Sequence, residues 1–292
     1  MEVFMSDFVI TTESTADLPA WYSADHDIII IPLTFTFDGV NILGEKENVD
    51  LKSFYTRMRN NELPKTMASN IDTVLKTFRS VLDTGKDVLH IAFSSGLSSS
   101  CNNAQIAAGM LKDEYPDRKI AVVDSLCASL GQGLFVDGAI RKRDEGCSLE
   151  ETVSWLEENK LHVCHIFTVD DLKYLKNGGR ISRTTAILGT LINVKPVLHM
   201  DNEGHLVPLF NVRGRKKALT SLVDKMEETV GNYKNVRVFI SHADSMDDAK
   251  FVGDLVSKRF GISEIMYGDI GPVIGSHSGP GTLALFYFGE SR

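Results

Sequence analysis

The sequence predicts an α/β protein of two domains. Along the first half of the chain, short apolar runs typical of strands alternate with periodic segments typical of helices. In the second half, a hairpin pattern is mixed with helices. The chain has 292 residues, of which 43% are hydrophobic and 24% charged. This composition is typical of a soluble globular protein with one large domain or two of ordinary size.

The first half, residues 1–160, is predicted to form a mostly parallel sheet with flanking helices. Strand-like runs lie at residues 8–11, 28–36, 88–93 and 120–124. Helix-like segments lie at residues 51–60, 70–83, 102–112, 128–143 and 149–159. Alternation of this kind favours parallel strands covered by helices.

The second half, residues 161–292, is predicted to form an α/β or α+β domain with a mixed sheet. It starts with a strand at 161–168 and a helix that ends at Gly178 and Gly179. An apolar segment at 186–191 follows, and then a hairpin of strands 194–200 and 205–212 around a turn at 201–204. Helices at 216–230 and 247–260 then alternate with strands at 236–242 and 262–269.

Two turns rich in serine and glycine are candidates for binding one small anion. Residues 93–100 follow a strand and precede a helix, and residues 270–281 form the second turn. Free backbone N–H groups and the positive end of a helix dipole attract a carboxylate or phosphate. Serine and glycine are also the ordinary residues of caps and tight turns, so the first turn alone leaves a structural role equally open.

Polar residues also follow three of the predicted strands, at 11–15, 94–98 and 124–125. Ligands of parallel sheets bind outside the carboxyl ends of the strands. The convergence of three polar strand ends therefore indicates a ligand site more strongly than any one of them.

Charge and composition disfavour several classes of function. The net charge of −8 argues against nucleic-acid binding, which needs a basic face. No stretch approaches the roughly 20 apolar residues of a membrane span, and the N-terminus lacks the pattern of a signal peptide. The scattered cysteines Cys101, Cys127, Cys147 and Cys164 indicate reduced thiols in a cytoplasmic protein.

A metal site is not expected. His162, Cys164 and His165 lie close together, but on a strand His165 points to the face opposite the other two. The sequence has no second cluster of ligands to complete a zinc site.

Several motifs in a fixed order resemble a known family. The most specific strings are Leu-Lys-Asn-Gly-Gly-Arg-Ile-Ser at 175–182 and Gly-Pro-Val-Ile-Gly-Ser-His-Ser-Gly-Pro-Gly at 271–281. Shorter motifs accompany them at 14–19, 64–66, 94–98, 123–125 and 195–198. Over nearly its whole length the chain resembles the DegV family.

The resemblance implies a protein that binds a long-chain fatty acid such as palmitate between its two domains, with no cofactor or metal. On the matching positions, the carboxylate donors are Thr66 and the turn containing Ser95, Gly96 and Ser98, with His277 close by. The acyl tail is expected to enter an apolar tunnel. Its candidate wall residues are Phe35, Phe37, Phe93, Ile187, Leu188 and Leu191, with the segments 186–191 and 194–198.

The resemblance also implies a partner. Relatives in the family act as the binding subunit of a bacterial fatty acid kinase, in which a separate subunit phosphorylates the bound carboxylate to an acyl phosphate. Arg180 and Arg213 match arginines expected to face the kinase or the phosphate.

Three positions depart from the family pattern. Glu13 stands where an Asp is common, Met67-Ala68-Ser69 replaces Ser-Gln-Pro, and Ser99-Ser100-Cys101 follows Ser98 in place of Gly-Thr. These changes leave Thr66 and Ser98 in place but alter their surroundings.

Two other function classes stay open. One is an enzyme, a phosphoryl or acyl transferase that uses Ser98 and His277. Against it, no motif places a carboxylate to orient His277, and no Walker sequence is present. The other is a structural or regulatory module without lipid, which leaves the convergence of Thr, Ser and His unexplained.

Overall fold

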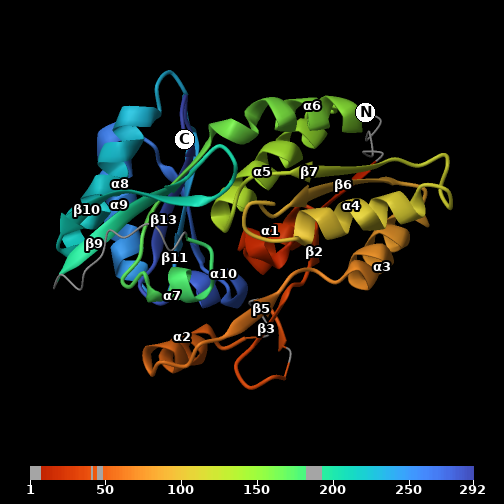
Figure 1. The fold of residues 1–292 in the computed structure, drawn as a ribbon. Coiled ribbons are helices and arrows are strands. Elements are labelled where there is room, and N and C mark those ends of the chain that lie inside the picture. Colours follow the sequence, from red (N-terminus) through yellow and green to blue (C-terminus); the bar gives the residue numbers. More distant parts are fainter. Residues whose placement is uncertain (1–7, 41, 45–48, 182–192) are drawn as a thin grey trace.

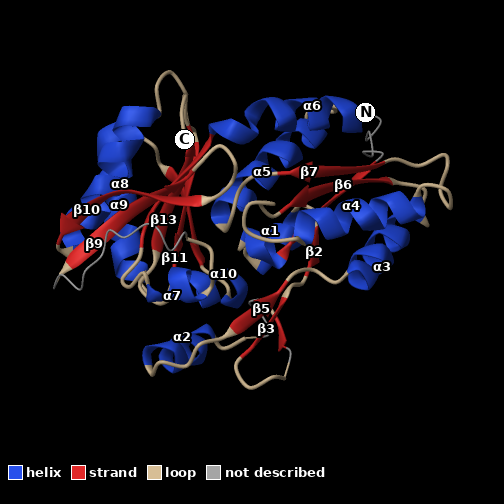
Figure 2. Ribbon diagram, in the orientation of Figure 1, coloured by secondary structure: helices blue, strands red, loops and turns tan. Residues whose placement is uncertain are grey.

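The computed structural model describes residues 8–40, 42–44, 49–181 and 193–292. These residues form sheets of four, six and three strands, with helices around and between them (Figures 1 and 2). The predicted α/β class, with a parallel sheet in the first half and a mixed sheet in the second, is confirmed. Within the described residues, no helix combines the length and apolar character needed to cross a membrane.

The four-stranded sheet is parallel throughout and belongs to the first half of the chain. Its strand order is β2 (Ile29–Ile31), β1 (Phe8–Glu13), β6 (Asp87–Ala92) and β7 (Ile120–Asp124). Helices α3 (Ile71–Leu82) and α4 (Ser100–Leu111) pack on one face through an apolar cluster that includes Phe78. The other face meets α5 (Leu130–Asp144) and α6 (Leu149–Asn159). Helix α6 begins with a capping box between Ser148 and Glu151, and the short helices η1 (Ser14–Ala16) and α1 (Ala20–Asp25) follow β1.

The six-stranded sheet is mixed and belongs to the second half of the chain. Its strand order is β10 (Leu206–Arg213), β9 (Val194–Met200), β8 (Val163–Thr168), β13 (Leu283–Phe288), β11 (Arg237–His242) and β12 (Glu264–Asp269). Only β11 and β12 run parallel, and the other neighbours are antiparallel. Helices α8 (Arg215–Thr229) and α9 (Met246–Phe260) pack on one face of this sheet.

The central strand β13 is missing from the sequence prediction, which ended the regular structure at residue 269. The run from Leu283 to Tyr287 is buried at every position, so it lacks the alternation of a half-exposed strand. The turn predicted at 270–281 is also partly wrong, because α10 (Pro272–Ser278) forms within it. Pro272 suits the first position of a helix, where its missing N–H has no partner to lose.

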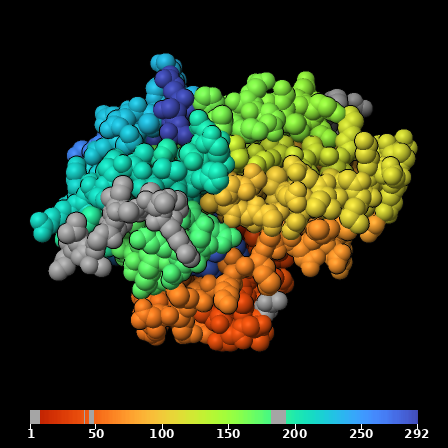
Figure 3. All heavy atoms as spheres, in the orientation of Figure 1, coloured from red at the N-terminus to blue at the C-terminus, as the bar shows by residue number. Residues whose placement is uncertain are grey.

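The strand predicted over residues 28–36 divides in two at Pro32. Strand β2 ends at Ile31, and β3 (Thr34–Thr36) begins a separate three-stranded sheet with β4 (Ile42–Leu43) and β5 (Lys65–Met67). Proline has no N–H to give to a sheet, and at this point the chain leaves the first sheet. In Figure 3 the orange-red segment that carries the small sheet forms the lower edge of the molecule.

The small sheet is joined to the second half of the chain through α2 (Leu51–Arg59) and α7 (Lys173–Asn177). Tyr174 donates a hydrogen bond to the carbonyl of Met58 at 3.0 Å. Tyr55 donates one to the carbonyl of Ile270 at 2.6 Å. Helix α7 is shorter than the predicted helix, but it ends at Gly178 and Gly179 as expected.

Helix α5 lies between the two large sheets (Figure 1). It contacts β1 of the first sheet and β8, β11 and β13 of the second, and residues 130–140 are all buried. A Cβ at Gly131 would lie 2.2 Å from Nε2 of His165 on β8. Glycine at this position therefore allows the helix to approach the second sheet.

Gly131→Ala is expected to lower the free energy of unfolding by about 1–3 kcal/mol, because a methyl group forces the His165 ring away from α5. Gly109→Ala is the matched control. Gly109 lies exposed on α4 with no atom within 4 Å of the added Cβ, so alanine is expected to stabilise by about 0.5–1 kcal/mol. Urea unfolding followed by circular dichroism measures both. A Gly131→Ala protein as stable as the parent would contradict the close approach.

Candidate functional site

Two adjoining cavities lie where the three sheets meet, each with a volume of about 60 Å³. The polar cavity is lined by Thr66, Ser98, Arg180 and His277 together with apolar side chains such as Phe93. The apolar cavity is lined mainly by Phe167, Met200, Ile270, Ala284 and Phe286. The residues that line both are Ala128, Leu175, Leu206, Ile274 and Ser278. The two cavities therefore share a wall, and one has a polar lining and the other an apolar lining.

Thr66 and His277 are brought together from distant parts of the chain. Thr66 lies on β5 and His277 on α10, and Thr66 Oγ1 is 2.7 Å from His277 Nε2. When His277 carries its proton on Nε2 and donates to Oγ1, the Thr66 hydroxyl proton is free for a further acceptor. His277 Nδ1 is buried without a hydrogen-bond partner among the described residues.

The imidazole of His277 is neutral at pH 7. Burial, and to a smaller extent the charge of the nearby Arg180 guanidinium, lower its pKa to about 4. His277 therefore acts as a neutral donor or acceptor at this site, while the positive charge comes from Arg180.

Arg180 follows α7 and faces the polar cavity. Its Nε donates to the carbonyl of Leu97 at 3.1 Å, and its Nη1 donates to the carbonyl of Gly178. Burial lowers the pKa of Arg180, but the ordinary pKa of a guanidinium is so high that the side chain remains charged. A guanidinium has five N–H donors, so these two bonds leave donors for a ligand.

Ser98 lies in the turn before α4. Its Oγ accepts from the N–H of Ser100 at 3.2 Å and lies 3.0 Å from the Ser100 hydroxyl. The positive end of the α4 dipole is therefore next to the Ser98 hydroxyl, on the wall of the polar cavity. Ser100, which is one of the departures from the family pattern, is therefore a hydrogen-bond partner of Ser98.

The same turn also fastens the two large sheets together. Ser94 Oγ donates to the carbonyl of Gly204, in the turn between β9 and β10, at 2.8 Å. A Cβ at Gly96 would lie 2.7 Å from the carbonyl oxygens of Glu203 and Gly204. Gly96 therefore packs against this turn.

Three of the predicted site residues lie outside the lining of both cavities: Ser95, Gly96 and Arg213. The backbone N–H of Ser95 donates to Asp124 Oδ1 at 3.2 Å, and Ser95 is exposed. Arg213 is exposed at the end of β10. Ser278, in contrast, is not among the predicted site residues, but it belongs to the site. It lines both cavities with its Oγ buried and unpartnered among the described residues, and only its place one residue after His277 hinted at this.

The polar strand ends converge, as predicted, but they bond to one another. Glu13 is fully buried and accepts from the N–H of Phe93 at 2.8 Å and from Gln132 Nε2 at 2.9 Å. Its Oε1 lies 3.3 Å from His90 Nε2. The Ser125 hydroxyl donates to the carbonyl of Ala92 at 2.6 Å. These groups hold β1, β6 and α5 together. Both carboxylate oxygens of Glu13, which stands where the family often has the shorter Asp, have hydrogen-bonding neighbours.

The candidate tunnel residues divide among three locations. Phe93 lines the polar cavity. Phe35 and Phe37 pack against Phe54 beside the small sheet. Ile187, Leu188 and Leu191, with the rest of the segment 186–191, lie outside the described residues.

The histidines and cysteine considered for zinc are engaged in other contacts. His165 Nδ1 donates to the carbonyl of Val163 at 3.0 Å, and its Nε2 accepts from the N–H of Ala128 at 3.1 Å. His162 Nδ1 lies 2.9 Å from the carbonyl of Gly289, and Cys164 Sγ lies 3.2 Å from that of Ser291. Among the residues that the structure describes, no group of three or more metal-binding side chains gathers.

Comparison with known proteins gives consistent matches along the chain. Residues 7–290 match the family model described as "Uncharacterised protein, DegV family". A DegV domain-containing protein of Clostridium perfringens is 38% identical over 292 residues, covering 99% of each chain. A crystal structure of a DegV lipid binding protein from Thermotoga maritima matches with a TM-score of 0.87 at 30% identity, covering 99% of this chain and 100% of that one. DegV of Bacillus subtilis, described as a fatty acid binding protein, matches with a TM-score of 0.84 at 31% identity, covering 98% and 100%.

The free energy of unfolding is expected to fall as the pH is lowered from 6.5 towards 4. The unfolded chain takes up protons near pH 6.5, whereas the folded chain keeps His277 neutral to about pH 4 and His165 to about pH 3. Each such histidine contributes up to about 1.4 kcal/mol per pH unit in this window. Above pH 6.5 the contribution is fully present.

Urea unfolding of the parent and of His277→Gln at several pH values between 7 and 4 measures this slope. The variant is expected to lose part of it, whereas His205→Gln, at an exposed histidine, is the matched control. Identical slopes in the parent and His277→Gln would contradict the buried neutral state of His277.

Proposed function

The chain belongs to the DegV family, and on this basis we propose that it binds a long-chain fatty acid between two domains formed by residues 1–160 and 161–292. The observation that carries the proposal is the pair of adjoining cavities, one lined by Thr66, Ser98, Arg180 and His277 and the other mainly by apolar side chains. Two of its solved relatives are described as lipid or fatty acid binding proteins. Together the two cavities give the proposed site a polar end and an apolar end, which suits an amphipathic ligand.

The polar end suits a carboxylate. A fatty acid is ionised at pH 7, and burying its charge without partners would cost several kcal/mol. The hydroxyls of Thr66 and Ser98 and the free N–H groups of Arg180 are donors for its two oxygens. His277, through its 2.7 Å bond to Thr66, orients the threonine hydroxyl towards the ligand.

The apolar end supplies most of the affinity. Each methylene group removed from water contributes about 0.8 kcal/mol, so a chain of roughly 16 carbons offers on the order of 10 kcal/mol before ordering costs. Phe167, Met200 and Phe286 are the large side chains that line this end. No cofactor or metal ion takes part in this function.

We further propose that the protein is a carrier that presents the carboxylate to a separate kinase subunit, which forms the acyl phosphate. Arg180 lines the polar end and is only half-buried, and Arg213 is exposed at the end of β10, so both suit a phosphate or a partner protein. The four free cysteines suit a reducing compartment, and we place this function in the cytoplasm.

The arrangement around His277 favours a carrier over a transferase. A general base needs a hydrogen bond to the nucleophile and a second group that fixes its tautomer. The Ser98 hydroxyl bonds to Ser100, and Nδ1 of His277 has no partner within the described part of the chain. Ser98 and His277 thus line the same cavity, but the Ser98 hydroxyl bonds to Ser100 and no described group fixes the tautomer of His277.

Thr66→Ala and Ser98→Ala are each expected to weaken palmitate binding about tenfold to a hundredfold, because loss of one donor to a charged acceptor costs about 1.5–3 kcal/mol. Calorimetric titration of the delipidated protein measures the affinities. Ser95→Ala is the matched control from the same turn, since Ser95 lies outside the cavity lining. Parental affinity in both Thr66→Ala and Ser98→Ala would refute the assignment of the polar end.

Ala284→Leu is expected to shift binding towards fatty acids shorter by roughly three carbon atoms, because leucine adds about three methylene-sized groups to the apolar cavity. Affinities for a series from dodecanoate to stearate measure the shift. Ala249→Leu overpacks a buried site on α9, on the far side of the six-stranded sheet, and controls for lost stability. If both variants lose stability and neither changes chain-length preference, Ala284 is an ordinary core residue.

A further inference from the structure

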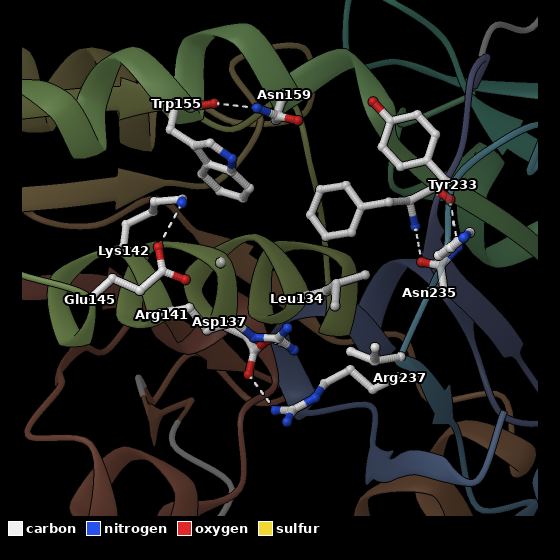
Figure 4. Close-up of a pocket in the computed structure, with 14 residues that line it drawn as sticks. Leu134, Asp137, Arg141, Lys142, Glu145, Trp155, Asn159, Tyr233, Asn235 and Arg237 are labelled. Carbon is white, nitrogen blue, oxygen red and sulfur yellow. Dashed lines mark hydrogen bonds and ion pairs between the residues drawn. The ribbon is translucent and has the colours of Figure 1, made fainter. Parts of the chain in front are cut away.

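A third cavity, which we call the α5–α6 pocket, lies apart from the two cavities of the proposed fatty acid site. Its volume is about 350 Å³, within the range of small-molecule sites, and it shares no lining residue with the other two cavities. Helices α5 and α6 form one side, and the segment 233–237 with Phe288 forms the other. The pocket thus lies between elements of both halves of the chain (Figure 4).

Aromatic side chains form one wall of this pocket. The Trp155 indole points from α6 into the cavity in Figure 4. Its ring lies 6.1 Å from that of Phe288, and Phe288 stacks on Tyr233 with centroids 6.4 Å apart. None of these three residues is completely buried, and the Trp155 ring also stacks on Phe135 with centroids 6.2 Å apart.

The remaining wall has more cationic than anionic side chains, although the chain as a whole carries a net charge of −8. The cationic residues are Arg141, Lys142, Lys234 and Arg237, against the two carboxylates of Asp137 and Glu145. Asp137 is shared, since Arg141 lies 2.8 Å from one of its oxygens and Arg237 lies 2.9 Å from the other.

Two cationic groups are left with unused donors. Arg237 Nε is buried and has no hydrogen-bond partner among the described residues. Lys234 is exposed and forms no ion pair within the described part of the chain. The Nη groups of Arg237 already pair with Asp137 and Glu264, so Lys234 is the exposed cation that an anion would neutralise.

We propose that the α5–α6 pocket is a second binding site for a small anion that carries a planar aromatic ring, such as a nucleoside monophosphate. The ring packs against Trp155 and its aromatic neighbours, and the anionic group binds near Lys234 and Arg237. Ring and charge are both required, because the pocket offers an aromatic wall and a cationic wall side by side.

The test uses AMP as the probe and Trp155 as the reporter. The chain has two tryptophans, so Trp21→Phe leaves Trp155 as the only tryptophan, which is excited selectively at the red edge of the absorption band. AMP is expected to quench its fluorescence in a saturable way, whereas adenosine and inorganic phosphate alone bind at least about tenfold more weakly.

Variants locate the site. Lys234→Ala is expected to weaken AMP binding about tenfold without loss of stability, because the side chain is exposed and unpaired. Arg180→Gln and Lys250→Ala, in the polar cavity and on α9, are expected to leave it unchanged. Absence of quenching, equal binding of AMP and phosphate, or parental AMP affinity in Lys234→Ala would each overturn the proposal, whether or not palmitate binds.

Discussion

Helix α5 is buried along residues 130–140 between the two large sheets, so each polar group on it has to find its partner inside the protein. Gln132 donates to Thr12 Oγ1 and Glu13 Oε2, both at 2.9 Å, and accepts from Thr15 Oγ1 at 3.0 Å. At the start of the helix, Ser129 donates to Asp17 Oδ2 at 2.6 Å. Asp17 Oδ1 in turn accepts from the N–H of Gly271, which caps α10. One buried helix thereby fixes the first sheet, the second sheet and the helix that carries His277.

The position of α5 also determines where space is left between the halves. Ala128 and Ser129, at its start, line the apolar cavity, and Asp137 to Glu145, near its end, line the α5–α6 pocket. Strand β13 also contributes to both, because Ala284 and Phe286 line the apolar cavity and Phe288 lines the α5–α6 pocket. Helix α5 and strand β13 therefore contribute lining residues to both sites.

The sequence was sufficient for most of the architecture, because apolar periodicity and caps are local signals. It failed where a tertiary contact decides the outcome. Strand β13 is apolar at nearly every position because it lies in the middle of a sheet, and this pattern has no alternation to detect. Pro32 divides a continuous apolar run between two sheets, which only the arrangement of the sheets reveals.

For the site, the family motifs identified Thr66, Ser98, Arg180 and His277, which the fold gathers around one cavity. The same motifs include Ser95 and Gly96, which lie outside the lining of both cavities. The N–H of Ser95 donates to Asp124, and Gly96 packs on the turn between β9 and β10. Motif spacing does not distinguish a residue that contacts a ligand from one that positions the turn. Ala128 lines both cavities without any local feature that marks it, and Ser278 is marked only by its place next to His277.

The most direct test of the account is mass spectrometry of the purified protein, under native conditions and after solvent extraction. The account predicts one long-chain fatty acid bound per chain, either retained from the cell or taken up from added palmitate, and its loss in a Thr66→Ala, Ser98→Ala double variant. A well-folded protein that carries no fatty acid in either case would contradict the central claim.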